Sequence, residues 1–183
     1  MKTPPRRTGL PAGLIAVAGG ALMLIGAFLG WLTTTTETGG RTSVSGFGAI
    51  AGDNPLVGSN LNDLLATGGL GTFRPGLVSL IVGGVTVLAG AAAALVRPAG
   101  RHPFRIAALV LVVGGLVGLG WGLWRGFDPG TGGVLAAGEG SAGAGPWLTA
   151  AGGLVALVCG YWLLSGRSDV RIDPSVRHPG IQL

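Results

Sequence analysis

The sequence predicts an all-α membrane protein, a four-helix transmembrane bundle with a small extracytoplasmic cap that contains a β-hairpin. Only 10% of the 183 residues are charged, against about 25% in an ordinary soluble domain, and the mean hydropathy is +0.63. Many of the 38 glycines lie inside apolar runs, which is typical of helices that pack closely in lipid. The length fits one compact unit, so we expect a single membrane domain over residues 1–183.

Four runs without a charged residue are long enough to cross a hydrocarbon core, which needs about 20 helical residues. These predicted spans are residues 9–31, 75–96, 106–124 and 147–165. A proline stands at or just before the first turn of each, where its missing N–H costs nothing. The four prolines are Pro11, Pro75, Pro103 and Pro146.

The basic residues predict the orientation of these spans. Nine lie on one side, namely Lys2, Arg6, Arg7, Arg97, Arg101, Arg105, Arg167, Arg171 and Arg177. Three lie on the other, namely Arg41, Arg74 and Arg125. Cytoplasmic flanks collect Lys and Arg, so both termini, the loop 97–105 and the tail 166–183 are expected in the cytoplasm, beneath the plasma (inner) membrane. The pI near 11.1 then reflects topology and contact with anionic lipid rather than nucleic-acid binding.

Aromatic residues gather near the predicted span ends. Trp31, Trp124 and Trp147 lie at three outer ends, and Tyr161 and Trp162 lie near the inner end of the last span. Amphipathic rings favour the headgroup level of a bilayer. We therefore expect these side chains to anchor the bundle in the lipid interface.

Small residues at four-residue spacing predict where the helices touch. Residues four apart share a helix face, and small side chains let two backbones approach. The strict row Gly114, Gly118 and Gly122 is the leading candidate, and Gly152, Ala156 and Gly160 form a second row. Looser strips in the first two spans include Ala12, Ala16 and Gly20, and Ser79 and Gly83. Packing inside one bundle and assembly of a homo-oligomer both remain open.

The outer loops are expected to differ in order. In the first, residues 32–74, the pair Gly39–Gly40 between two β-prone runs predicts a hairpin. Residues 59–67 predict a helical turn or two, capped by Ser59 or Asn60. The second outer loop, 125–146, is rich in Gly, Ala and Ser and is expected to be mobile, and the tail is expected to be disordered or loosely bound to the surface.

No familiar catalytic or metal-binding pattern is present. No Asp, Glu, Lys, Arg or His falls inside a predicted span, whereas ion-coupled transport normally needs such a group at depth. Cys159 is the single cysteine, and His102 and His178 are too far apart for a usual zinc motif. The outer oxygen-bearing residues lack the spacing and closing Glu of a calcium loop and are expected in turns and caps. They are Asp53, Asn54, Asn60, Asn62 and Asp63. We expect no cofactor.

The layout resembles small four-span membrane proteins of actinobacteria, including those encoded beside the tryptophan operon. The matching features are the Gly/Ala-rich first span ending in Trp31, Phe73-Arg-Pro-Gly-Leu-Val entering the second span, the Arg-rich turn 97–105, and Gly145-Pro-Trp-Leu opening the last span. The high ratio of Arg to Lys is typical of a GC-rich bacterial genome. The resemblance implies this layout and no particular activity.

The absence of chemistry at membrane depth, together with an ordered outer segment, favours a non-catalytic accessory or scaffold subunit. Its expected partners are the lipid bilayer and another membrane protein or a second copy of the chain. The alternative is an oligomeric pore-former or passive channel, lined by Ser79, Thr86 and glycine backbone. An enzyme acting on lipid at the outer surface would have only Asp53, Asp63 and Asp128 to work with.

Overall fold

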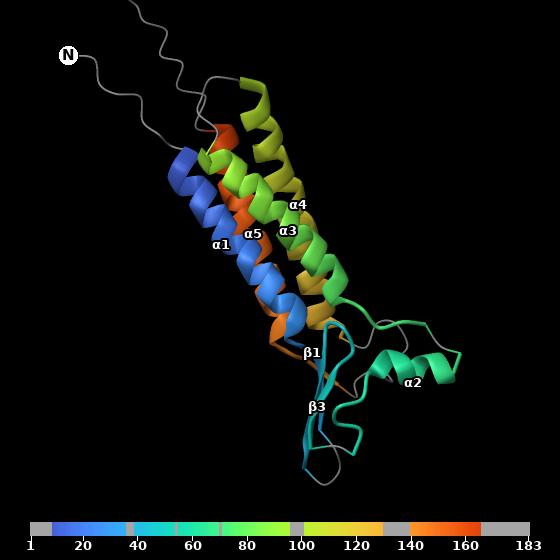
Figure 1. The fold of residues 1–183 in the computed structure, drawn as a ribbon. Helices are drawn as coiled ribbons and strands as arrows, with labels where there is room; N and C mark the ends of the chain where they lie inside the picture. The colour runs from blue at the N-terminus through green and yellow to red at the C-terminus, as the bar shows by residue number, and fades with distance from the viewer. Residues whose placement is uncertain are drawn as a thin grey trace, which may run out of the picture.

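Four long helices lie side by side, and a small β-sheet with a short helix lies at one end of them (Figure 1). The computed structural model describes residues 9–35, 39–53, 55–69, 71–95, 101–129 and 140–165. The long helices are α1 (Gly9–Phe28), α3 (Gly76–Leu95), α4 (Arg101–Phe127) and α5 (Ala144–Ser165). Each is long and apolar enough to cross a membrane, so the prediction of four such helices is confirmed.

The four long helices form a ring in which each has two close neighbours. Helix α1 contacts α3 and α5, and α4 contacts α5 and α3. The largest buried cluster between them is dominated by alanine, with Leu111, Cys159 and Leu163 among its few larger members. A core of such small side chains requires the helix axes to lie close together.

A four-stranded antiparallel sheet of order β3-β2-β1-β4 covers one end of the ring. Its strands are β1 (Gly30–Thr35), β2 (Arg41–Ser45), β3 (Ile50–Gly52) and β4 (Ser141–Ala142). Helix α2 (Leu61–Thr67) follows β3 and begins at Asn60, whose side chain accepts a hydrogen bond from the Asn62 amide at 2.9 Å. We call the sheet, α2 and their described connections the cap.

The predicted hairpin is confirmed. Strands β1 and β2 pair antiparallel on either side of Gly39 and Gly40, and Thr35 lies opposite Arg41. Gly39 has a φ of +82°, which a residue with a side chain adopts only with strain. Alternation along β2 buries Thr42 and Val44 on one face, as a half-covered strand requires.

The prediction for Trp31 was wrong in two respects. Helix α1 ends at Phe28, so Trp31 belongs to β1, and its side chain is 2% exposed rather than at a lipid interface. Its indole Nε1 donates a hydrogen bond of 2.8 Å to the carbonyl of Gly26, one of the carbonyls that a helix end leaves without an intrahelical partner. Gly46 and Gly145 leave the room that the indole occupies.

Two other span boundaries also differ from the prediction. Helix α4 begins at Arg101 and runs to Phe127, so Arg101 and Arg105 of the predicted loop 97–105 are helical. Helix α5 begins at Ala144, and just before it β4 pairs with β1, so part of the predicted loop 125–146 is sheet. The expectations for the rest of that loop, 130–139, and for the tail 166–183 fall outside the described residues.

The buried indole of Trp31 predicts a specific loss of stability on substitution. Trp31→Phe keeps an aromatic ring but leaves the Gly26 carbonyl without its donor, so we expect a loss of about 1–3 kcal/mol in unfolding free energy. Unfolding of the purified protein by added denaturing detergent, followed by circular dichroism, measures it. Trp162→Phe on the half-exposed face of α5 is the control. Equal shifts for the two variants would contradict the assigned role of Trp31.

Candidate interaction surfaces

The described residues hold no group of three or more His, Cys, Asp or Glu side chains that could bind a metal ion. Two of the cap residues considered as oxygen ligands, Asn60 and Asn62, take structural roles. The side chain of Asn62 donates to the carbonyl of Phe47 at 3.0 Å and accepts from the Phe73 amide at 2.7 Å, which joins α2 to both neighbouring segments. Asn60 caps α2. Asn54 lies outside the described residues.

The helix contacts at small residues are the most distinctive feature of the described ring. Between α1 and α3, Gly20 lies opposite Gly83, and a Cβ atom added at Gly83 would lie 3.0 Å from the Gly20 carbonyl oxygen. Seven residues along each helix, Gly13 lies opposite Gly90, where an added Cβ at Gly13 would be 2.6 Å from the Gly90 oxygen. These are distances at which no side chain fits between the backbones.

Two further helix pairs show the same seven-residue interval. Between α1 and α5, a Cβ at Gly19 would lie 2.9 Å from the Gly152 oxygen, and one at Gly26 would lie 2.8 Å from the Gly145 oxygen. Between α4 and α5 the contacts pair Gly115 with Gly153, Gly122 with Pro146, and Gly160 with Ala108. We call these three helix contacts the glycine seams.

The first predicted row does not lie on one contact. Gly122 faces α5, where an added Cβ would be 2.5 Å from the Ala150 nitrogen. Gly118 faces Met23 of α1 and Gly153 of α5. Gly114 faces α3, with Thr86 Oγ1 at 3.1 Å from an added Cβ. The row therefore turns from one neighbour to another along α4.

The second predicted row divides in the same way. Gly152 packs against the backbone of Gly19 in α1, whereas an added Cβ at Gly160 would lie 2.8 Å from the Val112 nitrogen in α4. Ala156 between them is fully buried. Both rows thus make contacts with neighbouring helices of the same chain.

Helix geometry explains why the four-residue rows turn. At 100° per residue, each step of four drifts by about 40°, so two steps drift by about 80°. A step of seven drifts by only about 20°. Gly115 and Gly153 were missed for this reason, although the sequence carried their signal, since Gly115 and Gly122 are seven apart and so are Gly153 and Gly160.

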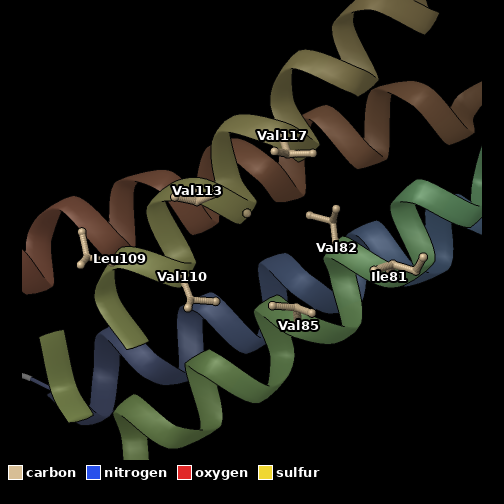
Figure 2. Close-up of a pocket in the computed structure, with 8 residues that line it drawn as sticks. Ile81, Val82, Val85, Leu109, Val110, Val113 and Val117 are labelled. Atoms are coloured by element: carbon tan, nitrogen blue, oxygen red, sulfur yellow. The ribbon is translucent and has the colours of Figure 1, made fainter. Parts of the chain in front are cut away.

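The fourth helix contact, between α3 and α4, is built differently. Gly114 is its small residue, and the facing side chains are mostly valines. They leave an apolar groove of about 350 Å³ that opens to the outside of the bundle, and Figure 2 shows the side chains of the two helices on its two sides. The lining residues are Ile81, Val82, Val85, Leu109, Val110, Val113, Gly114 and Val117. We call this the α3–α4 groove.

Aromatic and basic groups close the cap end of this contact. Trp121 Nε1 donates to the carbonyl of Pro75 at 3.1 Å, which ties α4 to the start of α3. Arg125, expected in an outer loop, lies instead in the last turn of α4 and is 9% exposed. Its guanidinium carbon lies 5.6 Å from the centre of the Phe73 ring and 5.5 Å from that of Trp121, and Asp128 attracts its charge. Stacking on aromatic faces suits a desolvated guanidinium.

Hydroxyl groups lie in the interior of the ring. Thr149 Oγ1 donates to Ser79 Oγ at 3.1 Å, which joins α5 to α3. Thr86 is fully buried, and its Oγ1 makes no hydrogen bond to another described residue. These few polar groups are enclosed by the helices rather than presented on the outside of the ring.

No family model matches the chain, and no curated protein matches it either. The resemblance to actinobacterial four-span proteins therefore stays a prediction.

Two neighbouring glycines of α4 provide a test of the seams. Gly122→Ala places a methyl group 2.5 Å from the Ala150 nitrogen, so we expect a loss of about 1–3 kcal/mol in unfolding free energy from overpacking. Gly120→Ala meets nothing within 4 Å and should be neutral or gain up to about 1 kcal/mol from helix propensity. Detergent-induced unfolding of both variants measures the difference. If Gly122→Ala proved as stable as Gly120→Ala, the close approach of α4 and α5 would be refuted.

Proposed function

We propose that the protein is a non-catalytic accessory or scaffold subunit of a plasma-membrane complex, with the cap outside the cell. The observation that carries this proposal is a cap fixed to the bundle that exposes apolar side chains. Trp31 and the β1–β4 pairing hold the cap in place. Leu56, Val57 and Leu64 are 45%, 51% and 39% exposed in the segment that contains α2. Exposed apolar groups on a held surface are typical of protein contacts.

The orientation is supported by the distribution of charge between the two ends of the bundle. Arg101 and Arg105 begin α4 at the end away from the cap, and the basic residues of the N-terminal segment and the tail adjoin that same end in sequence. The acidic residues that the structure describes all lie at the cap end of the bundle, namely Asp53, Asp63 and Asp128. The positive-inside rule then puts the cap outside.

The non-catalytic part of the proposal is supported by how the polar side chains are used. Asn60 and Asn62 are committed to hydrogen bonds within the cap. The negative charge of Asp128 attracts the positive charge of Arg125.

An oligomeric pore is the alternative function. Ser79 and Thr86, the side chains expected to line it, are 0% exposed inside the single-chain ring. A pore between copies of the chain would need these hydroxyls on an outer face. The helices would have to rearrange across the glycine seams to present them, so we favour the accessory subunit.

Cysteine labelling tests the orientation. In a Cys159→Ala background, Ala51→Cys on the exposed part of β3 should react with a membrane-impermeant maleimide on intact cells. Arg105→Cys, which is exposed near the other end of the bundle, should react only after the membrane is permeabilised. The reverse pattern would place the cap in the cytoplasm and overturn the proposed orientation.

Affinity purification tests the accessory role. From native membranes in mild detergent, the tagged chain should retain a partner in fixed stoichiometry, as measured by quantitative mass spectrometry. The double variant Val57→Asp, Leu64→Asp should lose most of that partner, because each charge would replace an exposed apolar contact.

Ala51→Asp is the control for added negative charge, since it places one aspartate at an exposed position of the cap sheet. It should retain the partner. A chain that elutes alone, or as a homo-oligomer, would contradict the accessory role, and a homo-oligomer that conducts ions in planar bilayers would support the pore.

A further inference from the structure

The α3–α4 contact is packed differently from the other three contacts of the ring. The other neighbouring helix pairs are closed by glycine seams, in which backbone meets backbone. Here valines from both helices hold the surfaces apart, and the space between them is about 350 Å³ (Figure 2). Every lining residue is apolar, so the occupant must present a hydrocarbon surface.

The groove runs along the middle of two helices that are apolar enough to cross a membrane. Its residues fall between positions 81 and 85 of α3 and between positions 109 and 117 of α4, well inside the candidate spans. With the bundle in the bilayer, as in the proposed function, the groove opens at hydrocarbon depth. An acyl chain matches both its chemistry and its surroundings.

A cationic residue, Arg74, lies at the cap end of the α3–α4 contact. Arg74 lies two residues before the start of α3 and directly precedes Pro75, whose carbonyl accepts the hydrogen bond from Trp121 of α4, so Arg74 lies at the cap end of the contact between the two helices. The Arg74 carbonyl accepts from the Leu77 amide at 3.1 Å, so the chain already turns there. Its guanidinium is exposed and makes no hydrogen bond or ion pair with another described residue.

The spacing suits the two parts of a phospholipid. From Gly76 to Ile81 the helix rises by about 8 Å, and Arg74 lies two residues further toward the cap. The headgroup and interfacial region of a bilayer adds about 5–8 Å beyond the hydrocarbon on each side. When Ile81 lies within the hydrocarbon, Arg74 therefore lies at the level of the phosphate groups.

The facing helix supplies a matching interfacial residue. Trp124 follows Val117 by seven residues on α4, so it lies on the same side of that helix, and it is 52% exposed. Its ring packs edge-on against Trp121 with centroids 5.4 Å apart. An indole held in this way offers an N–H donor at headgroup level. The nearby negative charge, Asp128, is engaged with Arg125.

We propose that the α3–α4 groove binds one acyl chain of a phospholipid from the leaflet at the cap end, with the lipid's anionic headgroup held at Arg74. The charge complementarity selects an anionic lipid over a zwitterionic one, and the groove selects a chain over bare headgroup contact. This inference rests on the membrane placement in the proposed function and does not depend on a protein partner.

Native mass spectrometry of the purified full-length chain tests the proposal. The detergent-solubilised protein is titrated with phosphatidylglycerol and, separately, with phosphatidylcholine carrying the same acyl chains. We expect one tightly retained phosphatidylglycerol and weaker retention of phosphatidylcholine. Arg74→Ala should lower the phosphatidylglycerol affinity about fivefold and leave phosphatidylcholine unchanged, because one basic residue near a lipid surface contributes about this factor.

A second variant tests the groove independently of charge. Val85→Phe should fill the groove and weaken the retention of both lipids equally. Leu154→Phe, on the exposed face of α5, and Arg105→Ala, at the end away from the cap, are the matched controls and should change neither lipid. Circular dichroism of each variant confirms that the bundle is folded.

Two results of the lipid titration would overturn the proposal. One is an unchanged preference for phosphatidylglycerol in Arg74→Ala, and the other is an equal effect of Val85→Phe and Leu154→Phe. A polypeptide that crosslinks to a photoreactive group at position 85 in native membranes, in place of lipid, would also overturn it. Because the lipid titration uses the isolated chain, its failure is distinguishable from the absence of a protein partner, and either can occur without the other.

Discussion

The approach of helix backbones at seven-residue intervals is the constraint on which the rest of the structure depends. Glycine lowers intrinsic helix stability by about 1 kcal/mol relative to alanine, so a chain this rich in glycine needs a compensating gain. The gain is dispersion contact along the seams, where Gly20 meets Gly83 and Gly115 meets Gly153 without side chains between them. In hydrocarbon no hydrophobic drive would hold helices together otherwise.

The three glycine seams allow the fourth helix contact to be different. Once α1 holds α3 and α5, and α5 holds α4, the positions of all four helices are fixed without close packing between α3 and α4. Trp121 then closes the cap end of that contact through Pro75. The ring can therefore keep an open apolar groove on one side at little cost to its stability.

The sequence allowed the four helices and the hairpin to be predicted because each depends on local signals, namely uncharged runs and the Gly39–Gly40 turn. Trp31 could not be placed in this way, because its pocket is made by Gly46 and Gly145, which are distant along the chain. Strand β4 has only two residues and exists through its pairing with β1. The residues of the two four-residue rows lie at helix contacts, but each row is divided among neighbouring helices, because it describes one helix alone, whereas a contact between two antiparallel helices repeats every seven residues.

The position of β4 has a consequence for how the protein is made. Strand β1 leaves the first long helix and β4 immediately precedes the last, so the sheet is complete only when both ends of the chain are in place. Until α5 is inserted, β1, β2 and β3 can pair with one another, but one edge of β1 has no partner strand. Insertion of α5 brings β4 beside that edge. Completion of the sheet thus reports correct insertion of the final helix, and a chain truncated before residue 141 would carry an unprotected edge that quality-control proteases could recognise.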